Sequence, residues 1–206
     1  MGSHGSRELH RSERPQGQDR RRGRRCAIYD RRIGAHVIFV RAANVGGSGV
    51  FSTAAVAKKL DLLNIGAAGT FVARSSVSVA EIAREIPFPL DLAIRPAAEV
   101  VKLVDAGAPR APAGAQVFVS VLVGPAKQSP RLPLEVPDGR PWALRVVAKS
   151  GPYVVSLRRP ERRALDLSAV VEKAYGARST TRGWPTFERI AAAVRSLEAP
   201  ARRARR

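Results

Sequence analysis

The segment AHVIFVRAANVGGSGVF, residues 35–51, decides how the folded part of the chain begins. Its β-branched and aromatic run starts near His36 and ends near Asn44, which predicts a strand buried on both faces. Gly46 and Gly47 then lead toward a helix that Ser52 can cap. Because glycines expose backbone N–H groups and a helix N-terminus favours negative charge, a small anion could bind at this connection.

The same glycines have a second interpretation. A P-loop needs Lys and then Ser or Thr directly after its last glycine, and a dinucleotide-binding turn needs a different glycine register; the segment has neither. Gly46 and Gly47 can instead supply the positive φ angles of a strand-to-helix turn. The spacing leaves the small-anion site and the simple turn open.

The rest of the first half alternates helices and strands. Apolar spacing predicts a helix over 52–66, one or two half-exposed strands over 70–79, a short helix over 79–86, a strand over 90–96 and a helix over 97–107. This order predicts an α+β unit with a mixed or antiparallel sheet.

A proline-rich joint near residue 110 precedes a partial repeat of the pattern. Strands are predicted over 115–124, 143–149 and 153–158, and helices over 167–176 and 185–199. We therefore expect a first α+β half over 34–112 and a second over 113–199. An Arg-rich arm over 1–33, too polar to form a core, and a basic tail over 200–206 flank them.

The net charge of +19 suggests nucleic acid as a partner, because Lys and Arg neutralise phosphates. However, residues 1–33 hold ten Arg against four acidic residues, and the tail holds four more Arg, so about half of the surplus lies outside the folded region. The core charge is either a binding face or a compositional background. No apolar stretch is long enough to span a membrane, and a single cysteine fits a reducing cytoplasm.

The segment ARSTTRGWPTF, residues 177–187, is the second polar stretch of interest. Thr180, Thr181 and Arg182 stand before Trp184, and Pro185 can begin a helix. Hydroxyls, a guanidinium and a helix N-terminus could bind phosphate, with the indole as a stacking surface. The segment could equally be a capping turn in which Trp184 anchors the packing.

Groups for catalysis or metal binding are scarce. His4 and His10 fall in the arm, and His36 begins a buried strand, so a Ser-His-Asp triad is not expected. Carboxylates do not cluster at metal-ligand spacing, and we expect no metal and no cofactor. Four acidic residues are interpreted as isolated, solvated charges: Asp61, Asp91, Glu99 and Asp105.

Taken together, VRAANVGG (40–47) and STTRGWPTF (179–187) resemble the two hallmark motifs of the bacterial family called domain of unknown function 1697. The residues that match are Arg41, Asn44, Val45, Gly46 and Gly47 in the first motif, and Thr180, Thr181, Arg182, Trp184 and Thr186 in the second. The resemblance covers about residues 35–197 and implies two ferredoxin-like α+β halves, without implying an activity.

The chain also departs from the family. Arg74, Ser75 and Ser76 stand where the family has Ser-Gly-Asn, and Gly183 and Pro185 replace two asparagines. The resemblance is therefore to a divergent member, in which a central polar site is altered or lost.

The leading hypothesis is a non-catalytic protein that binds a small anionic or phosphorylated ligand between the two stretches. The expected ligand-binding residues are Arg41, Asn44, Gly46, Gly47, Thr180, Thr181, Arg182 and Trp184. Two alternatives remain: weak nucleic-acid association through the basic arm and tail, and an enzyme that acts on a phosphorylated substrate without histidine chemistry.

Overall fold

The structure is a computed structural model that describes residues 34–41, 43, 50–75, 77–86, 88, 91–137, 141–159 and 165–203. The predicted arm, Asn44, Gly46, Gly47 and Ser76 lie outside the described residues. The elements are β1 (His36–Val40), α1 (Thr53–Lys59), β2 (Leu63–Gly66), β3 (Thr70–Ala73), α2 (Val79–Glu85), β4 (Leu92–Pro96), α3 (Ala97–Asp105), β5 (Gln116–Leu122), β6 (Leu134–Val136), β7 (Leu144–Ser150), β8 (Tyr153–Arg158), α4 (Leu167–Tyr175), β9 (Ser179–Gly183) and α5 (Trp184–Arg203). The predicted α+β class is confirmed.

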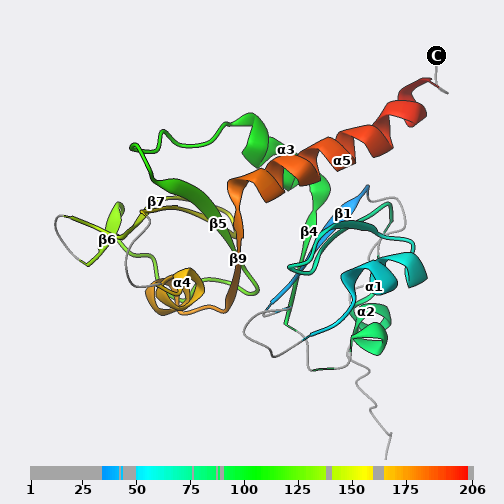
Figure 1. The fold of residues 1–206 in the computed structure, drawn as a ribbon, viewed down its shortest axis with the longest axis horizontal. Helices are drawn as coiled ribbons and strands as arrows, with labels where there is room; N and C mark the ends of the chain where they lie inside the picture. The colour runs from blue at the N-terminus through cyan, green and yellow to red at the C-terminus, as the bar shows by residue number, and fades with distance from the viewer. Residues whose placement is uncertain are drawn as a thin grey trace, which may run out of the picture.

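The first sheet has the strand order β2-β3-β1-β4, and all its pairs are antiparallel (Figure 1). With α1 and α2 in the two crossovers, this is the βαββαβ order of a ferredoxin-like unit. As predicted, β1 is buried on both faces, since all five of its residues are buried. In the sheet β1 lies between β3 and β4, and helices cover both faces of the sheet.

The second sheet has the order β6-β7-β8-β5-β9, also antiparallel throughout. Its strands β7-β8-β5-β9 repeat the order of the first sheet, and α4 lies where α2 lies in the first half. In place of a helix such as α1, the described part of the connection from β5 to β7 contains the strand β6. The expected recurrence of the pattern is confirmed, with this one replacement.

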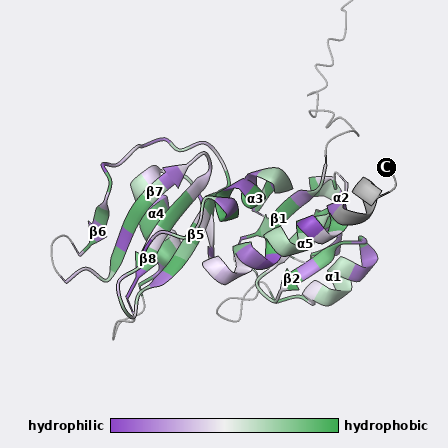
Figure 2. Ribbon diagram, turned by 90° about the horizontal axis from the view of Figure 1, so that it is seen from above, coloured by the Kyte–Doolittle hydropathy of each residue, from purple (hydrophilic) through white to green (hydrophobic). Residues whose placement is uncertain are grey.

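The two halves share a hydrophobic core. Ile38, Phe71 and other residues of one face of the first sheet pack against α1 and α2. Val37 and Phe39 on the opposite face pack with Phe187 and further residues of α5, an element of the second half. Figure 1 shows α5 running from β9 across to the first half. Figure 2 shows the two halves next to each other, seen from above.

Two predicted elements end earlier than expected. The helix predicted over 52–66 ends at Lys59, because Asp61 takes a positive φ of 51° that breaks the helical path, and residues 63–66 form β2. The strand predicted over 70–79 ends at Ala73 and is buried at all four positions rather than half-exposed. Ser78 then caps α2 in a capping box with Glu81.

The predicted turn before the last helix is also wrong. Residues 179–183 form the edge strand β9, which pairs along β5, and α5 begins at Trp184. The polar sequence Ser-Thr-Thr-Arg-Gly has little apolar alternation, and its strand conformation comes from its backbone pairing with β5.

Candidate functional site

The two polar stretches singled out in the sequence meet where β1 ends beside β9. The backbone oxygen of Val40 accepts hydrogen bonds from Arg182 Nη2 at 2.9 Å and from the Thr180 hydroxyl at 3.4 Å. Val40 and Thr180 are 140 residues apart in sequence. This contact joins the first sheet to the second.

The guanidinium of Arg182 is fully used by protein acceptors. Its five N–H groups donate to Thr70 Oγ1 at 2.9 Å, Thr180 Oγ1 at 2.8 Å, the Thr181 oxygen at 2.8 Å, the Val40 oxygen at 2.9 Å and the Ala68 oxygen. Burial lowers the pKa of Arg182 to about 10, so the group stays charged at neutral pH. Ligand binding by Arg182 stays a prediction, and this geometry supports a connecting role instead.

Arg41 also lies between the halves. Its Nε and Nη2 donate to the two carboxylate oxygens of Glu172 on α4 at 3.1 and 3.2 Å, and its Nη1 is 3.6 Å from Asp91. Arg178 donates to both oxygens of Asp91 at 2.7 Å. The hydrogen bonds that Arg41 donates to Glu172 raise the pKa of Arg41. The interpretation of Asp91 as an isolated charge is wrong, because the tertiary fold places two cations against it.

The remaining described members of the predicted set point elsewhere. Successive side chains of a strand face opposite sides, so Thr181 points away from the first half. Its hydroxyl lies 2.6 Å from that of Ser120 and 3.0 Å from that of Ser168. Trp184 is 7% exposed in the shared core, and its indole N–H donates to Glu188.

The glycine connection lies outside the described residues, and with it Asn44, Gly46 and Gly47. Whether this connection binds an anion stays a prediction. The structure brings Arg41, Thr180 and Arg182 together where β1 ends beside β9, whereas Thr181 faces Ser120 and Ser168 and Trp184 lies in the shared core.

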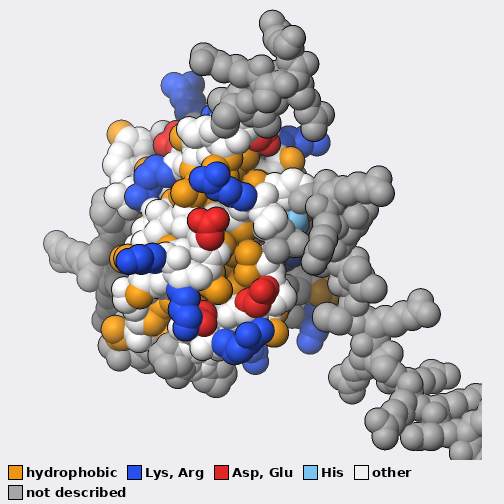
Figure 3. All heavy atoms as spheres, turned by 90° about the vertical axis from the view of Figure 1, so that its right-hand side faces the viewer, with side chains coloured by type: hydrophobic (Ala, Val, Ile, Leu, Met, Phe, Trp, Pro, Cys, Tyr) orange, Lys and Arg blue, Asp and Glu red, His pale blue; other side chains and the backbone are white. Residues whose placement is uncertain are grey.

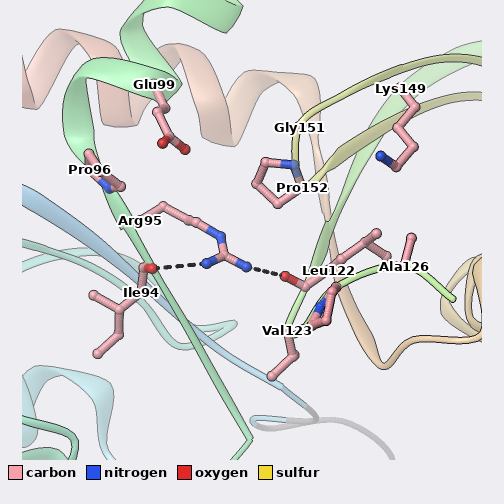
Figure 4. Close-up of a pocket in the computed structure, with 12 residues that line it drawn as sticks. Ile94, Arg95, Pro96, Glu99, Leu122, Val123, Ala126, Lys149, Gly151 and Pro152 are labelled. Carbon is pink, nitrogen blue, oxygen red and sulfur yellow. Dashed lines mark hydrogen bonds between the residues drawn. The ribbon is translucent and has the colours of Figure 1, made fainter. Parts of the chain in front are cut away.

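A cavity of about 600 Å³ opens elsewhere between the halves (Figure 4). Its walls are the end of β4, the first turn of α3, the end of β5 and the β7–β8 hairpin. The lining residues are Ile94, Arg95, Pro96, Glu99, Leu122, Val123, Gly124, Pro125, Ala126, Lys149, Gly151 and Pro152. Two cations and one carboxylate are therefore the charged groups of a cavity whose lining surface is about equally polar and apolar.

Unlike Arg182, Arg95 has N–H groups for which the described residues supply no acceptor. Its Nη1 donates to the Ile94 oxygen at 3.3 Å and its Nη2 donates to the Leu122 oxygen, which ties β4 to the second half (Figure 4). Its Nε is buried and has no acceptor among the described residues. Since a guanidinium has five N–H donors, three of them are without a described partner.

Glu99 is the carboxylate of this cavity. It accepts a hydrogen bond from the Tyr153 hydroxyl at 3.3 Å. Burial, and then the Glu99 charge, raise the pKa of Tyr153 well above its usual range, so the phenol stays protonated and acts as a donor. Glu99 was also predicted to be an isolated charge; this is wrong, as it is for Asp105, which pairs with Arg195 at 2.5 Å.

Sequence reasoning missed Arg95 and Lys149. The available signal was a single cation within the otherwise apolar strand LAIRP, directly before a helix. Lys149 carries no such signal, because an exposed lysine near a hairpin is common on protein surfaces.

Other site classes receive no support from the described part of the chain. No group of three or more His, Cys, Asp or Glu residues there could hold a metal ion, and no described helix is both long and apolar enough to cross a membrane. On the face in Figure 3, Lys and Arg side chains are interleaved with Asp and Glu rather than gathered in one basic patch. Nucleic-acid binding through the arm and tail stays a prediction.

Comparisons with known proteins add the following. No family model and no curated protein matches the chain. A conserved bacterial protein from Streptococcus pneumoniae is similar in structure, with a TM-score of 0.47 and 14% sequence identity; the match covers 78% of this chain and 98% of that one.

Proposed function

We propose that this protein binds a small anionic ligand in the cavity between its halves, through Arg95 and Lys149. The observation that carries the proposal is the guanidinium of Arg95, which lines a cavity of about 600 Å³ while one N–H on each of its two Nη atoms has no partner among the described residues. Unpaired donors on a charged group favour an anionic acceptor, because charge-assisted hydrogen bonds are the strong ones.

The local charges fit one anionic group. Lys149 makes no ion pair among the described residues, and in Figure 4 it extends toward the cavity from the wall opposite Arg95. Glu99 opposes a second negative charge near α3, while its hydrogen bond with Tyr153 occupies one of its oxygens. A phosphate or carboxylate group between Arg95 and Lys149 meets these requirements.

The test is a titration of the full chain with inorganic phosphate, followed by two-dimensional NMR. We expect saturable shifts of the Gly124 and Gly151 amides, which line the cavity. Arg95→Gln should weaken binding about tenfold or more, because a charge-assisted pair contributes roughly 1.5–3 kcal/mol.

The matched control is Arg110→Gln, which removes the same charge from an exposed position outside the cavity lining. It should leave the phosphate affinity within about twofold, since exposed charges act weakly at physiological salt. Equal weakening by both variants would show non-specific attraction to a basic chain and would contradict the proposal.

We also propose that the chain is a divergent cytoplasmic member of the domain of unknown function 1697 family. The support is that the two motif stretches, far apart in sequence, contact each other through Val40 and Arg182. An alignment of close homologues in which positions 41, 181 and 182 vary freely would count against this membership.

A further inference from the structure

A second cavity, of about 540 Å³, lies beside the first. The two share Glu99, Gly151 and Pro152 in their walls. The second extends along α3 toward the shared core, and its remaining lining residues are Lys102, Leu103, Ala106, Gly107, Ala108, Pro109, Ala148, Ser150, Tyr153, Val155 and Trp184.

The two cavities differ in chemistry. Arg95 and Lys149 line only the first. The second has one cation, Lys102, and its apolar wall is formed by Leu103 with the small exposed parts of Tyr153 and Trp184. Trp184 is 7% exposed and its indole N–H is already paired with Glu188, so what it can offer a ligand there is apolar ring surface. A mainly apolar wall favours an apolar group such as a phenyl ring, through the area that it removes from water.

We infer that the ligand is an aromatic molecule with a single anionic end, such as a phenylalkyl phosphate or phenylalkyl carboxylate, and that it occupies both cavities. The anionic end lies between Arg95 and Lys149, and the ring lies against Trp184 and Leu103. Glu99, at the boundary, disfavours a second anionic group on the ring. The inference rests on the proposed function, because it uses the same anion site.

The experiment measures the affinities of four phosphate monoesters: methyl, benzyl, 2-phenylethyl and 3-phenylpropyl phosphate. All four carry the same charged group, so differences report the ring and the length of its linker. At least one of the three esters that carry a phenyl ring, called aryl esters below, should bind about tenfold or more tightly than methyl phosphate. The reason is the apolar area that a buried ring removes from water. That ester should also shift the NMR signal of the Trp184 indole N–H.

Two variants of the second cavity sharpen the test. Ala148→Phe adds a ring at an exposed strand position that lines this cavity, and Leu103→Ala removes part of its apolar wall. Each should remove most of the preference for the aryl ester while methyl phosphate still binds within about twofold. Ala54→Phe, on the exposed side of α1 and outside the lining of both cavities, is the matched control and should change neither affinity.

The outcomes separate the two proposals. Absence of any saturable binding by all four esters overturns both. Binding of methyl phosphate with no aryl ester more than twofold tighter overturns the aromatic ligand and leaves the anion site standing. A preference for the aryl ester that survives in both variants also overturns it, because the ring would then lie outside the second cavity.

Discussion

Arg182 contributes to the fold through the number of acceptors it satisfies. Three backbone oxygens and two threonine hydroxyls, from both halves, converge on one guanidinium. A planar side chain with five donors in a fixed arrangement can serve all of them, whereas an ammonium group has only three donors at one point. The charge alone therefore does not explain why an arginine suits this position.

At this scale we predict that Arg182→Met lowers the free energy of unfolding by about 3 kcal/mol, because half-buried acceptors lose their donors. The free energy of unfolding of Arg182→Lys should fall between that of Arg182→Met and that of the wild type. Arg189→Met is the control. This exposed guanidinium bonds Thr186 in the same turn and no other described residue, so its loss should change stability by less than about 0.5 kcal/mol. Urea denaturation measures all three, and equal values for Arg182→Met and the control would contradict the prediction.

At the scale of elements, the turn between β2 and β3 holds the interface in place. Gly69 has a φ of +68°, and its carbonyl accepts from the Val40 N–H at 2.8 Å. A Cβ added at Gly69 would lie 2.7 Å from Ala43 Cβ and 2.9 Å from Val40 Cβ. The neighbouring Ala68 supplies an acceptor to Arg182, so a shift of this turn also disturbs the contact between the halves.

We predict that Gly69→Ala costs about 3 kcal/mol of unfolding free energy, from left-handed backbone strain and from the close contact together. Gly107→Ala is the matched control, since Gly107 has a φ of +84° but nothing lies within 4 Å of its added Cβ. It should cost only about 1 kcal/mol, the backbone part alone. Thermal and chemical denaturation compare the two, and equal losses would show that the contact with Val40 and Ala43 relaxes freely.

At the scale of the whole molecule, the two ferredoxin-like halves depend on one another. Phe39 of the first half stacks on Phe187 of α5, with ring centroids 5.7 Å apart, and Tyr153 packs edge-on against the same ring at 6.3 Å. Without α5, one face of the first sheet would lose its apolar cover. A sheet with an exposed apolar face is unstable in water.

We therefore predict that residues 34–112 and residues 113–203, produced separately, do not fold cooperatively, and that mixing them restores a complex with the secondary structure of the intact chain. Circular dichroism and NMR dispersion of each fragment and of the mixture check this. A first fragment that unfolds cooperatively by itself would show that its sheet does not need α5.

The candidate site shows where sequence reasoning ends. The prediction that the two polar stretches belong together followed from their residue types, and Val40 and Arg182 do meet. Their partners could not be predicted, because Arg41 with Glu172 is a pair 131 residues apart, and such a pairing depends on how the two sheets pack. Arg95 was overlooked for the same reason, since the opposite wall of its cavity comes from the second half.

Local sequence was enough to predict the α+β class, the partial recurrence of the strand and helix pattern, the buried β1 strand and the capped start of α1. These features depend on local residue order, on the period at which apolar residues recur, and on side chains that reach neighbouring backbone groups. Three other features come from the tertiary fold: β9 is a strand, Arg182 is consumed by internal acceptors, and Arg95 lines a cavity with N–H groups that have no described acceptor. Each of these depends on which distant backbone lies within about 3 Å of a given donor, and no local pattern in the sequence encodes that distance.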